Sequence, residues 1–249
     1  MTTTHVTYIG GPTALIEYGE LRILLDPTFD DPRGHANNLR KTAAPGLPTS
    51  AVEPIDLVLL SHHAHADNLD HAGRELTLRA PLVLSGPDAA AALGGPVTGL
   101  APWQSHQLGD VTITALPGRH GPRLLRPLVG PVTSFLVTSP AEPSLYVSGD
   151  NSSLARVREH ATRIGPVDIA FLFAGAARVA PLPVPLTLTS AKAAEAAHLL
   201  GARAVVGVHV EDWAHFSESR ADLEKAFTDA GLHELLVDTP RGERVAIEL

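Results

Sequence analysis

Histidine and aspartate cluster in one short stretch of this chain, Ser61-His62-His63-Ala64-His65-Ala66-Asp67-Asn68. The stretch follows the apolar run 55–60, which is typical of a buried strand. On an extended backbone alternate side chains share a side, so His63, His65 and Asp67 would point the same way. Imidazole nitrogens and carboxylate oxygens are ligands that borderline divalent metals prefer, zinc above all. A lone histidine here would more often be a solvated surface residue, but this density predicts a metal site.

The same residue types follow other apolar runs later in the chain. They are His120 after the run 111–116, Asp150 after 144–148 and His209 after 204–208. Each alone would most often be structural, but all of them stand at the C-terminal ends of predicted strands, as the first cluster does. This shared placement indicates one common site.

The remaining pattern predicts two sheets covered by helices. The apolar segments 14–18 and 21–25 flank Gly19-Glu20, which is a two-residue hairpin signal. After residue 152, predicted helices and strands alternate, and Ser219 with Asp222 gives a helix-capping signal. Early hairpins followed by this alternation favour two sheets with helices outside them. A chain of 249 residues without repeats or linkers is expected to form one domain, 1–249.

Composition narrows the classes of function. The chain has no cysteine, so thiolate ligands, disulfides and cysteine nucleophiles are excluded, and histidine and carboxylates remain as ligands. The net charge of −8 disfavours a nucleic-acid partner, because neutralising phosphates requires a basic surface. No apolar run approaches the about 18 residues of a membrane span, and no secretory signal opens the chain. We therefore expect a cytoplasmic protein that acts on a small molecule; its oligomeric state stays open.

The ordered set of polar positions resembles the metallo-β-lactamase superfamily, in particular the branch with ascorbate-6-phosphate lactonase. The superfamily pattern is His-x-His-x-Asp-His followed by a distant His, Asp and His, and it falls here on His63, His65, Asp67, Asn68, His120, Asp150 and His209. The resemblance extends over residues 5–215. It implies an α/β fold, an αβ/βα four-layer sandwich with two central sheets, helices on the outer faces and the metal site at one edge.

Two positions depart from the family pattern. The resemblance implies a first metal site of His63, His65 and His120 with Asp150 bridging, and a second site of Asp67 and His209. Asn68 stands where the family has a further imidazole of the second site, and an amide oxygen is a much weaker zinc ligand. The second site therefore lacks one of the imidazoles of the family pattern. His62 is an extra residue: either the strand end carries a bulge, or His62 has taken part of a ligand role.

The resemblance also implies a reaction. Metal-activated water would attack a small ester, lactone or phosphoester, with Asp67 and His209 as catalytic residues. The metal would be Zn²⁺, as one or two ions, with Mn²⁺ as the alternative. Arg119, in a basic segment without acidic residues from 117 to 131, would bind an anionic substrate group, and His215 would line the pocket. The competing interpretations are a phosphodiesterase or nuclease of the same fold, and a catalytically degenerate metal-binding module.

Overall fold

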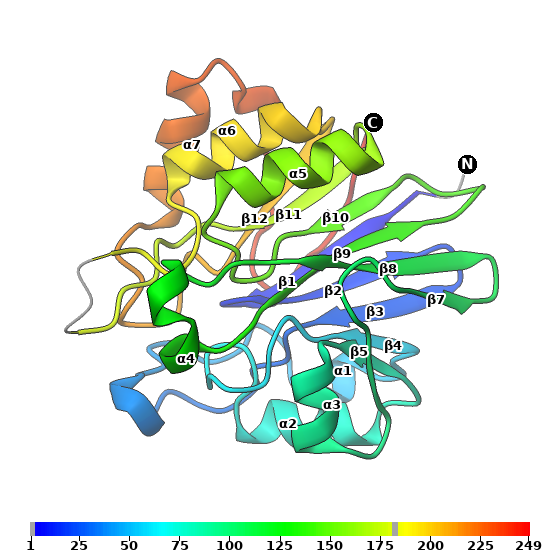
Figure 1. Ribbon diagram of the computed structural model, residues 1–249, viewed down its shortest axis with the longest axis vertical. Helices are drawn as coiled ribbons and strands as arrows, with labels where there is room; N and C mark the ends of the chain where they lie inside the picture. The colour runs from blue at the N-terminus through cyan, green and yellow to red at the C-terminus, as the bar shows by residue number, and fades with distance from the viewer. Residues whose placement is uncertain (1–2, 181–183) are drawn as a thin grey trace.

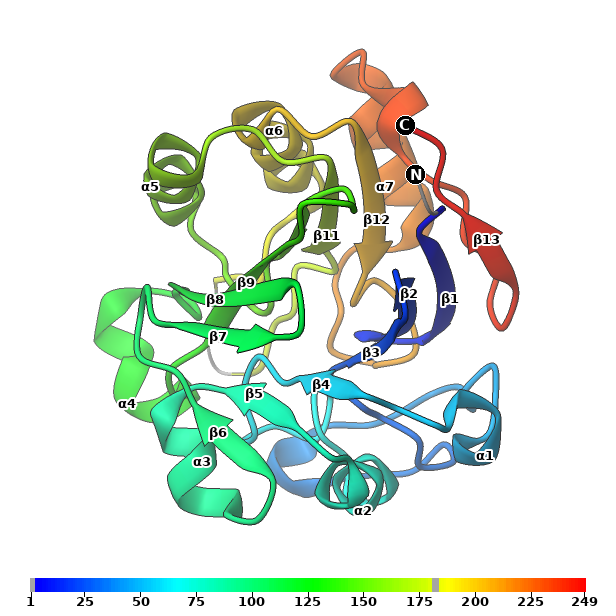
Figure 2. The ribbon, with the colours of Figure 1, turned by 90° about the vertical axis from the view of Figure 1, so that its right-hand side faces the viewer.

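The predicted α/β fold is confirmed by the computed structural model, which describes residues 3–180 and 184–249, apart from the side chains of Leu125 and Arg126. Two mixed sheets face each other in the described ranges (Figures 1 and 2). In spatial order the seven-stranded sheet contains β13 (Arg244–Ala246), β1 (His5–Gly10), β2 (Thr13–Tyr18), β3 (Leu21–Leu25), β4 (Leu57–Leu59), β5 (Val83–Ser85) and β6 (Val97–Gly99). The six-stranded sheet contains β12 (Ala204–Val208), β11 (Ile169–Phe173), β10 (Leu145–Val147), β9 (Thr133–Thr138), β8 (Val111–Pro117) and β7 (Ser105–Leu108).

Helices cover the outer face of each sheet, which gives four layers (Figure 2). The first sheet carries α1 (Thr49–Val52), α2 (His71–Arg79) and α3 (Pro87–Leu93), and the second carries α5 (Leu154–Ile164), α6 (Ser190–Leu200) and α7 (Arg220–Asp229). Short turns η1 (Ala36–Asn38), η2 (Arg123–Leu125) and η3 (His233–Leu235) and the one-turn helix α4 (Arg126–Val129) lie in the connections. Within the described ranges, no helix is both long and apolar enough to span a membrane.

Three apolar clusters hold the layers together. The largest fills the space between the sheets and includes Tyr8, Ile16, Phe135 and Phe171. One further cluster packs the second sheet against its helices, and another packs the first sheet against α1 and α2. Burial of these side chains on both sheet faces explains why several strands read as continuous apolar runs rather than as an alternating pattern.

Local signals fix several of these elements. The hairpin of β2 and β3 turns at Gly19-Glu20, as predicted. The side chain of Ser219 accepts a hydrogen bond from the amide of Asp222, whose carboxylate accepts one from the Ser219 amide, so the predicted capping box of α7 is present. Thr189 caps α6 in the same way by accepting from the Lys192 amide. The short strands β6, β7 and β13 carry no strong apolar signal, and the sequence pattern did not predict them.

The second sheet brings its strand ends to one edge. β10, β11 and β12 run parallel, so the residues that follow them emerge at the same edge of the sheet. β3 and β4 are parallel neighbours in the first sheet. Gly149 lets the two sheets' loops approach, because a Cβ there would lie 2.7 Å from the Cβ of Ser61 and 2.8 Å from the oxygen of Thr133. Its φ of +52° also favours glycine.

A buried histidine behind this sheet should make the protein less stable in acid. His160 of α5 is fully buried, with Nδ1 3.0 Å from the Tyr146 hydroxyl and Nε2 3.2 Å from the Pro117 oxygen. Burial lowers the pKa of His160 from 6.5 to about 4. The unfolded chain therefore takes up this proton first, and stability is lost as the pH falls from about 6.5 to about 4.

His160→Gln removes this titration. Between about pH 7 and about pH 4.5, the free energy of unfolding should fall by about 2 kcal/mol more in the wild type than in the variant. Urea unfolding of both proteins at both pH values measures the difference. Equal losses in the two proteins would show that His160 does not titrate in this range.

Candidate metal centre

Four strand ends deliver histidines and aspartates to one edge of the fold. The segment after β4 supplies His62, His65 and Asp67, and the segments after β8, β10 and β12 supply His120, Asp150 and His209. All except His65 are buried. These side chains form two groups, each with potential ligand atoms within 4.8 Å of one another. The strand ends predicted to share a site are therefore close together in space. One ligand differs from the prediction, because His62 stands in the place expected for His63.

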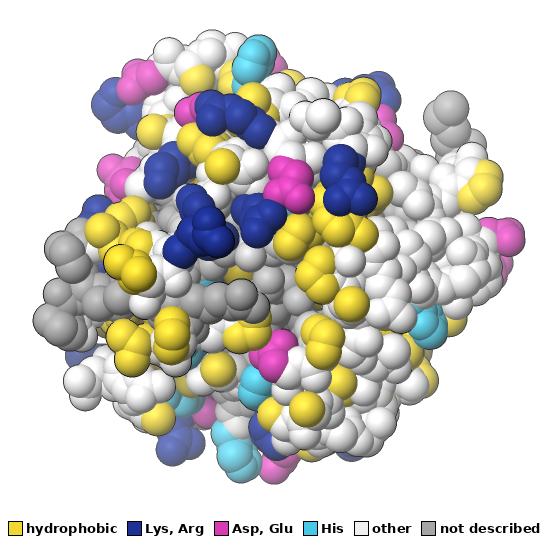
Figure 3. Space-filling view, viewed as in Figure 1, with side chains coloured by type: hydrophobic (Ala, Val, Ile, Leu, Met, Phe, Trp, Pro, Cys, Tyr) yellow, Lys and Arg dark blue, Asp and Glu magenta, His cyan; other side chains and the backbone are white. Residues whose placement is uncertain are grey.

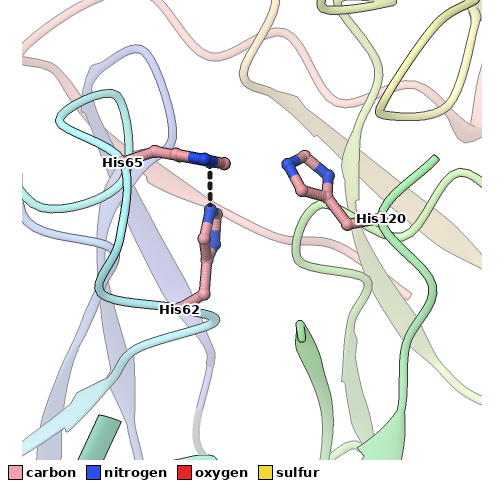
Figure 4. Close-up of side chains that lie close together, drawn as sticks. All are labelled: His62, His65 and His120. Atoms are coloured by element: carbon pink, nitrogen blue, oxygen red, sulfur yellow. Dashed lines mark hydrogen bonds between the residues drawn. The ribbon is translucent and has the colours of Figure 1, made fainter. Parts of the chain in front are cut away.

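Three imidazoles make the first group (Figure 4). Nε2 of His62 is hydrogen-bonded to Nδ1 of His65 at 2.9 Å. The ring of His120, from the opposite sheet, has its centroid 5.2 Å from that of His62 and 5.3 Å from that of His65. Such a set offers nitrogen donors from separate elements to one ion.

Two carboxylates and an imidazole make the second group, Asp67, Asp150 and His209. Nε2 of His209 lies 3.3 Å from Oδ2 of Asp67 and 3.5 Å from Oδ1 of Asp150. His209 has a φ of 58°, in the left-handed region that residues other than glycine rarely adopt, and its amide donates to the Gly11 oxygen at 2.6 Å. Backbone strain of this kind concentrates at functional sites.

The extra histidine changes which side chain joins the first group. His63 was the expected ligand, but His62 takes the place beside His65 and His120. His63 instead is half-buried, with Nδ1 3.6 Å from Oδ2 of Asp88. The reason is that β4 ends at Leu59, so the histidines lie in an irregular loop rather than on an extended strand. The period-two alternation that selected His63 does not apply there.

Asp26 and Ser61 orient His62. The amide and hydroxyl of Ser61 donate to the Asp26 carboxylate at 2.6 and 2.5 Å. Because the hydroxyl proton is committed to Asp26, the Ser61 oxygen accepts from Nδ1 of His62 at 3.1 Å. The lone pair of His62 then lies on Nε2, which faces the group. Burial raises the pKa of Asp26 to about 7, against the lowering effect of hydrogen bonds from Asn68 and Ser61.

The sequence reasoning gave Asp26 and Ser61 no role at the site. The available signal was the placement of Asp26 directly after the predicted strand 21–25, the same position that singled out the other polar residues. Parallel pairing of β3 with β4 then sets Asp26 beside Ser61.

Both groups contain buried polar atoms without a hydrogen-bond partner among the described residues. Nδ1 of His120 lies 3.0 Å from the Leu186 oxygen and must donate to it, so the free lone pair is on Nε2. Within the described part of the chain, His120 Nε2, His209 Nε2 and Asp67 Oδ1 are buried without a hydrogen-bond partner. Such atoms are costly unless they are satisfied. A divalent cation fits this donor set, so the residues present are suited to metal.

Asn68, expected at the weak point of the second site, directs its amide nitrogen to two carboxylates, and its buried amide oxygen has no hydrogen-bond partner among the described residues. Its buried amide nitrogen donates to Oδ2 of Asp26 at 2.9 Å and to Oδ1 of Asp150 at 3.1 Å. Asn68 therefore joins the carboxylate behind His62 to a carboxylate of the second group. The second group has three side chains without a contribution from Asn68.

The surroundings keep His62 and His65 neutral. Burial lowers the pKa of His62 to about 3, against the opposing effect of Asp150. Burial also lowers the pKa of His65. Neutral imidazoles have the free lone pair that a metal ligand needs, so these residues require no deprotonation at neutral pH.

The second group is held in charged form. Burial alone would raise the pKa of Asp67, but its close contacts with His209 and His215 hold it well below the usual range. The pKa of Asp150 is lowered, despite burial, chiefly by the charge of His209. The two carboxylates in turn raise the pKa of His209 against the effect of burial. The carboxylates are thus anionic at neutral pH, as cation ligands must be.

The two predicted substrate residues adjoin different groups of the centre. Nε2 of His215 donates to Oδ2 of Asp67 in the second group at 2.9 Å, and the His215 side chain is 10% exposed. Arg119 precedes His120 and lines a neighbouring cavity of about 870 Å³. Its amide donates to Oδ1 of Asn151 at 3.1 Å, and its Nε is buried without a hydrogen-bond partner among the described residues.

Comparison with known proteins shows what this arrangement is similar to. A family model described as "Beta-lactamase superfamily domain" matches residues 21–210, a range that contains both groups. A UPF0173 metal-dependent hydrolase of Pyrococcus abyssi is 24% identical over 228 residues, which are 90% of this chain and 92% of that protein.

Solved structures share the fold over nearly the whole chain. An isothiocyanate hydrolase from Delia radicum gut bacteria superposes with a TM-score of 0.85 at 22% identity, covering 98% of this chain and 99% of that one. A possible metal-dependent hydrolase from Veillonella parvula gives a TM-score of 0.86 at 17% identity, covering 99% and 100%. At these identities the likeness concerns the fold alone.

Proposed function

This chain belongs to the β-lactamase superfamily, and we propose that it is a metal-dependent hydrolase of a small ester, lactone or phosphoester. The observation that carries the proposal is the pair of buried donor groups at one edge of the two sheets. Each group has three potential ligand side chains, which favours a catalytic centre over a degenerate metal-binding module. The net charge of −8 favours a small substrate over a nucleic acid.

We propose zinc as the metal, with manganese as the alternative. His62, His65 and His120 would hold one ion, and the oxygen-richer set of Asp67, Asp150 and His209 would hold a second. A bound divalent ion supplies a Lewis acid that polarises the attacked bond and lowers the pKa of water to about 7.

The chain's own side chains have separate tasks. Asp67 remains ionised at neutral pH, and its depressed pKa makes it a weak base, so it would orient the nucleophilic water rather than take its proton. His209, between the carboxylates, would complete the second group. His215 holds Asp67 and, being half-buried, can also contact the substrate. Arg119 would bind an anionic part of the substrate through its free guanidinium nitrogens.

A substrate screen with controlled metal content tests the proposal. The panel would contain p-nitrophenyl acetate, a γ-lactone, bis-p-nitrophenyl phosphate and, because a structural neighbour is named for it, an aryl isothiocyanate. The resemblance to the lactonase branch is the reason for the lactone. Protein freed of metal should leave every compound at the uncatalysed rate, and added Zn²⁺ or Mn²⁺ should restore hydrolysis of at least one oxygen ester. Metal should also raise the melting temperature by linkage. Full activity of demonstrably metal-free protein would overturn the proposal.

A further inference from the structure

The cavity beside the metal centre is lined by both apolar and charged side chains. It is bounded by the segment after β8, the N-terminal half of α5, the start of α3 and the segments on either side of α4. Lys and Arg side chains gather over the region of α5 on this face of the molecule, with apolar side chains beside them (Figure 3). At about 870 Å³ it is in the range of small-molecule sites, about 300–1,000 Å³.

Most of the wall is apolar. Its apolar side chains include Leu100, Ala115, Leu116, Pro122, Val132 and Ala155. Leu100, Ala115 and Leu116 are themselves buried, which makes the floor of the cavity part of the packed fold. A ligand that fills the cavity would remove its own apolar surface from water against this wall, and each methylene that it buries should strengthen binding about three- to fourfold.

The charged side chains that line the cavity have a net positive charge, since three arginines stand against Asp88 and Glu159. Arg156 is paired with Glu159, so neither is free for a ligand. Arg119 and Arg123 also line the cavity and form no ion pair among the described residues, whereas Asp88 faces His63 at 3.6 Å. Nε of Arg119 is buried and unpartnered, which is a desolvated donor for an anionic group.

The cavity adjoins two loops that carry ligands of the metal centre. Arg119 directly precedes His120, and its carbonyl accepts hydrogen bonds from the amide and hydroxyl of Ser152 at 2.8 and 3.1 Å. Ser152 follows Asp150 by two residues and precedes Ser153, which lines the cavity. A molecule in the cavity thus touches the segments that position His120 and Asp150.

We propose that this cavity binds apolar monoanions, represented by medium-chain carboxylates, and that it holds the apolar body of the substrate with its charge on Arg119. The part of the proposal in which the cavity holds the substrate rests on the proposed function. Binding itself does not, because the arginines of the wall, Arg119 and Arg123, carry their charge without a bound metal.

Displacement of a fluorescent apolar anion, 8-anilinonaphthalene-1-sulfonate, tests the binding in purified protein before and after metal removal. Butanoate, hexanoate, octanoate and uncharged octanol would serve as competitors. Octanoate should bind about tenfold more tightly than hexanoate, and at least about tenfold more tightly than octanol. Equal affinity for butanoate and octanoate would overturn the proposal.

Ala155→Phe and Ala191→Phe form a matched pair of variants. Both alanines are exposed and are the second residue of an 11-residue helix, but Ala155 lines the cavity and Ala191 does not. Ala155→Phe should weaken octanoate binding at least about tenfold, and Ala191→Phe by less than about twofold. Arg119→Gln should weaken octanoate about tenfold and leave octanol unchanged. Equal effects of the two phenylalanines, or of Arg119→Gln on both competitors, would refute the site.

Hydrolysis separates the two parts of the proposal. With metal-loaded protein, octanoate should inhibit competitively, and Ala155→Phe should raise KM for an octanoyl ester more than for an acetyl ester. Binding without competition would refute the substrate assignment and leave a separate anion site. If no compound is hydrolysed although octanoate binds as described, the proposed function fails and the binding site stands.

Discussion

His62→Ala should reduce hydrolysis more than about a hundredfold, whereas His63→Ala should leave it within about twofold of the wild type. The physical reason is that His62 contributes one of three nitrogens to the first group, while His63 points to Asp88. Loss of a residue that merely supports a ligand costs about 10- to 100-fold in metal affinity, so loss of a ligand should cost more.

The two variants control for each other, since they remove the same side chain from adjacent positions. Metal content after gel filtration should fall by one ion per chain for His62→Ala and remain unchanged for His63→Ala. Circular dichroism would establish that both variants are folded. The reverse result, with His63→Ala losing the ion, would restore the ligand set expected from the family pattern.

The strand-end positions could be predicted from sequence because each follows an apolar run. His120, Asp150 and His209 stand directly after segments whose burial is evident from composition, and C-terminal strand ends meet at one edge in a layered α/β fold. The fold class followed from the same runs and the hairpin signal. Short strands such as β6 and β13, with three residues each, are too brief to leave a periodic pattern.

The choice between His62 and His63 could not be predicted in this way. A single inserted residue decides which histidine faces His65, and the backbone there is an irregular loop rather than a strand. Such a loop has no fixed period, so the direction of a side chain depends on tertiary contacts. Here the contact is the hydrogen bond between Ser61 and Nδ1 of His62, which itself requires Asp26.

The role of Asn68 was hidden for a related reason. Its amide reaches Asp26 across 42 positions of sequence and Asp150 across 82, and no local pattern announces such partners. The family pattern marked Asn68 only as a missing ligand. In the fold it is a donor to two buried carboxylates, which suits an amide and not an imidazole, since a neutral imidazole has a single N–H.

Asn68→Leu should therefore destabilise the metal-free protein by about 3 kcal/mol and weaken the second ion about 10- to 100-fold. The substitution removes a donor to ionised Asp150, at about 1.5–3 kcal/mol, and a donor to Asp26, at about 0.5–1.5 kcal/mol because Asp26 is only partly ionised near neutral pH. Asp150 also loses a hydrogen bond that holds it in place beside Asp67 and His209, and the loss of such a supporting hydrogen bond weakens metal binding. Urea unfolding after metal removal and titration with Zn²⁺ measure the two quantities.

Metal counts for the wild type and Asn68→His distinguish the positioning role from a vacant ligand place. If Asn68 positions Asp150, the wild type holds two ions through the separate groups, and Asn68→His does not raise the number because the second group already has three side chains. If Asn68 instead marks a lost ligand, the wild type holds one tight ion and Asn68→His binds a second. Asn68→Leu separates the two cases further. If Asn68 marks a lost ligand, the variant should bind its single ion with unchanged affinity. If Asn68 positions Asp150, the variant should bind the second ion more weakly. One ion in the wild type, rising to two in Asn68→His, would therefore show that the hydrogen bonds of Asn68 do not complete the second site.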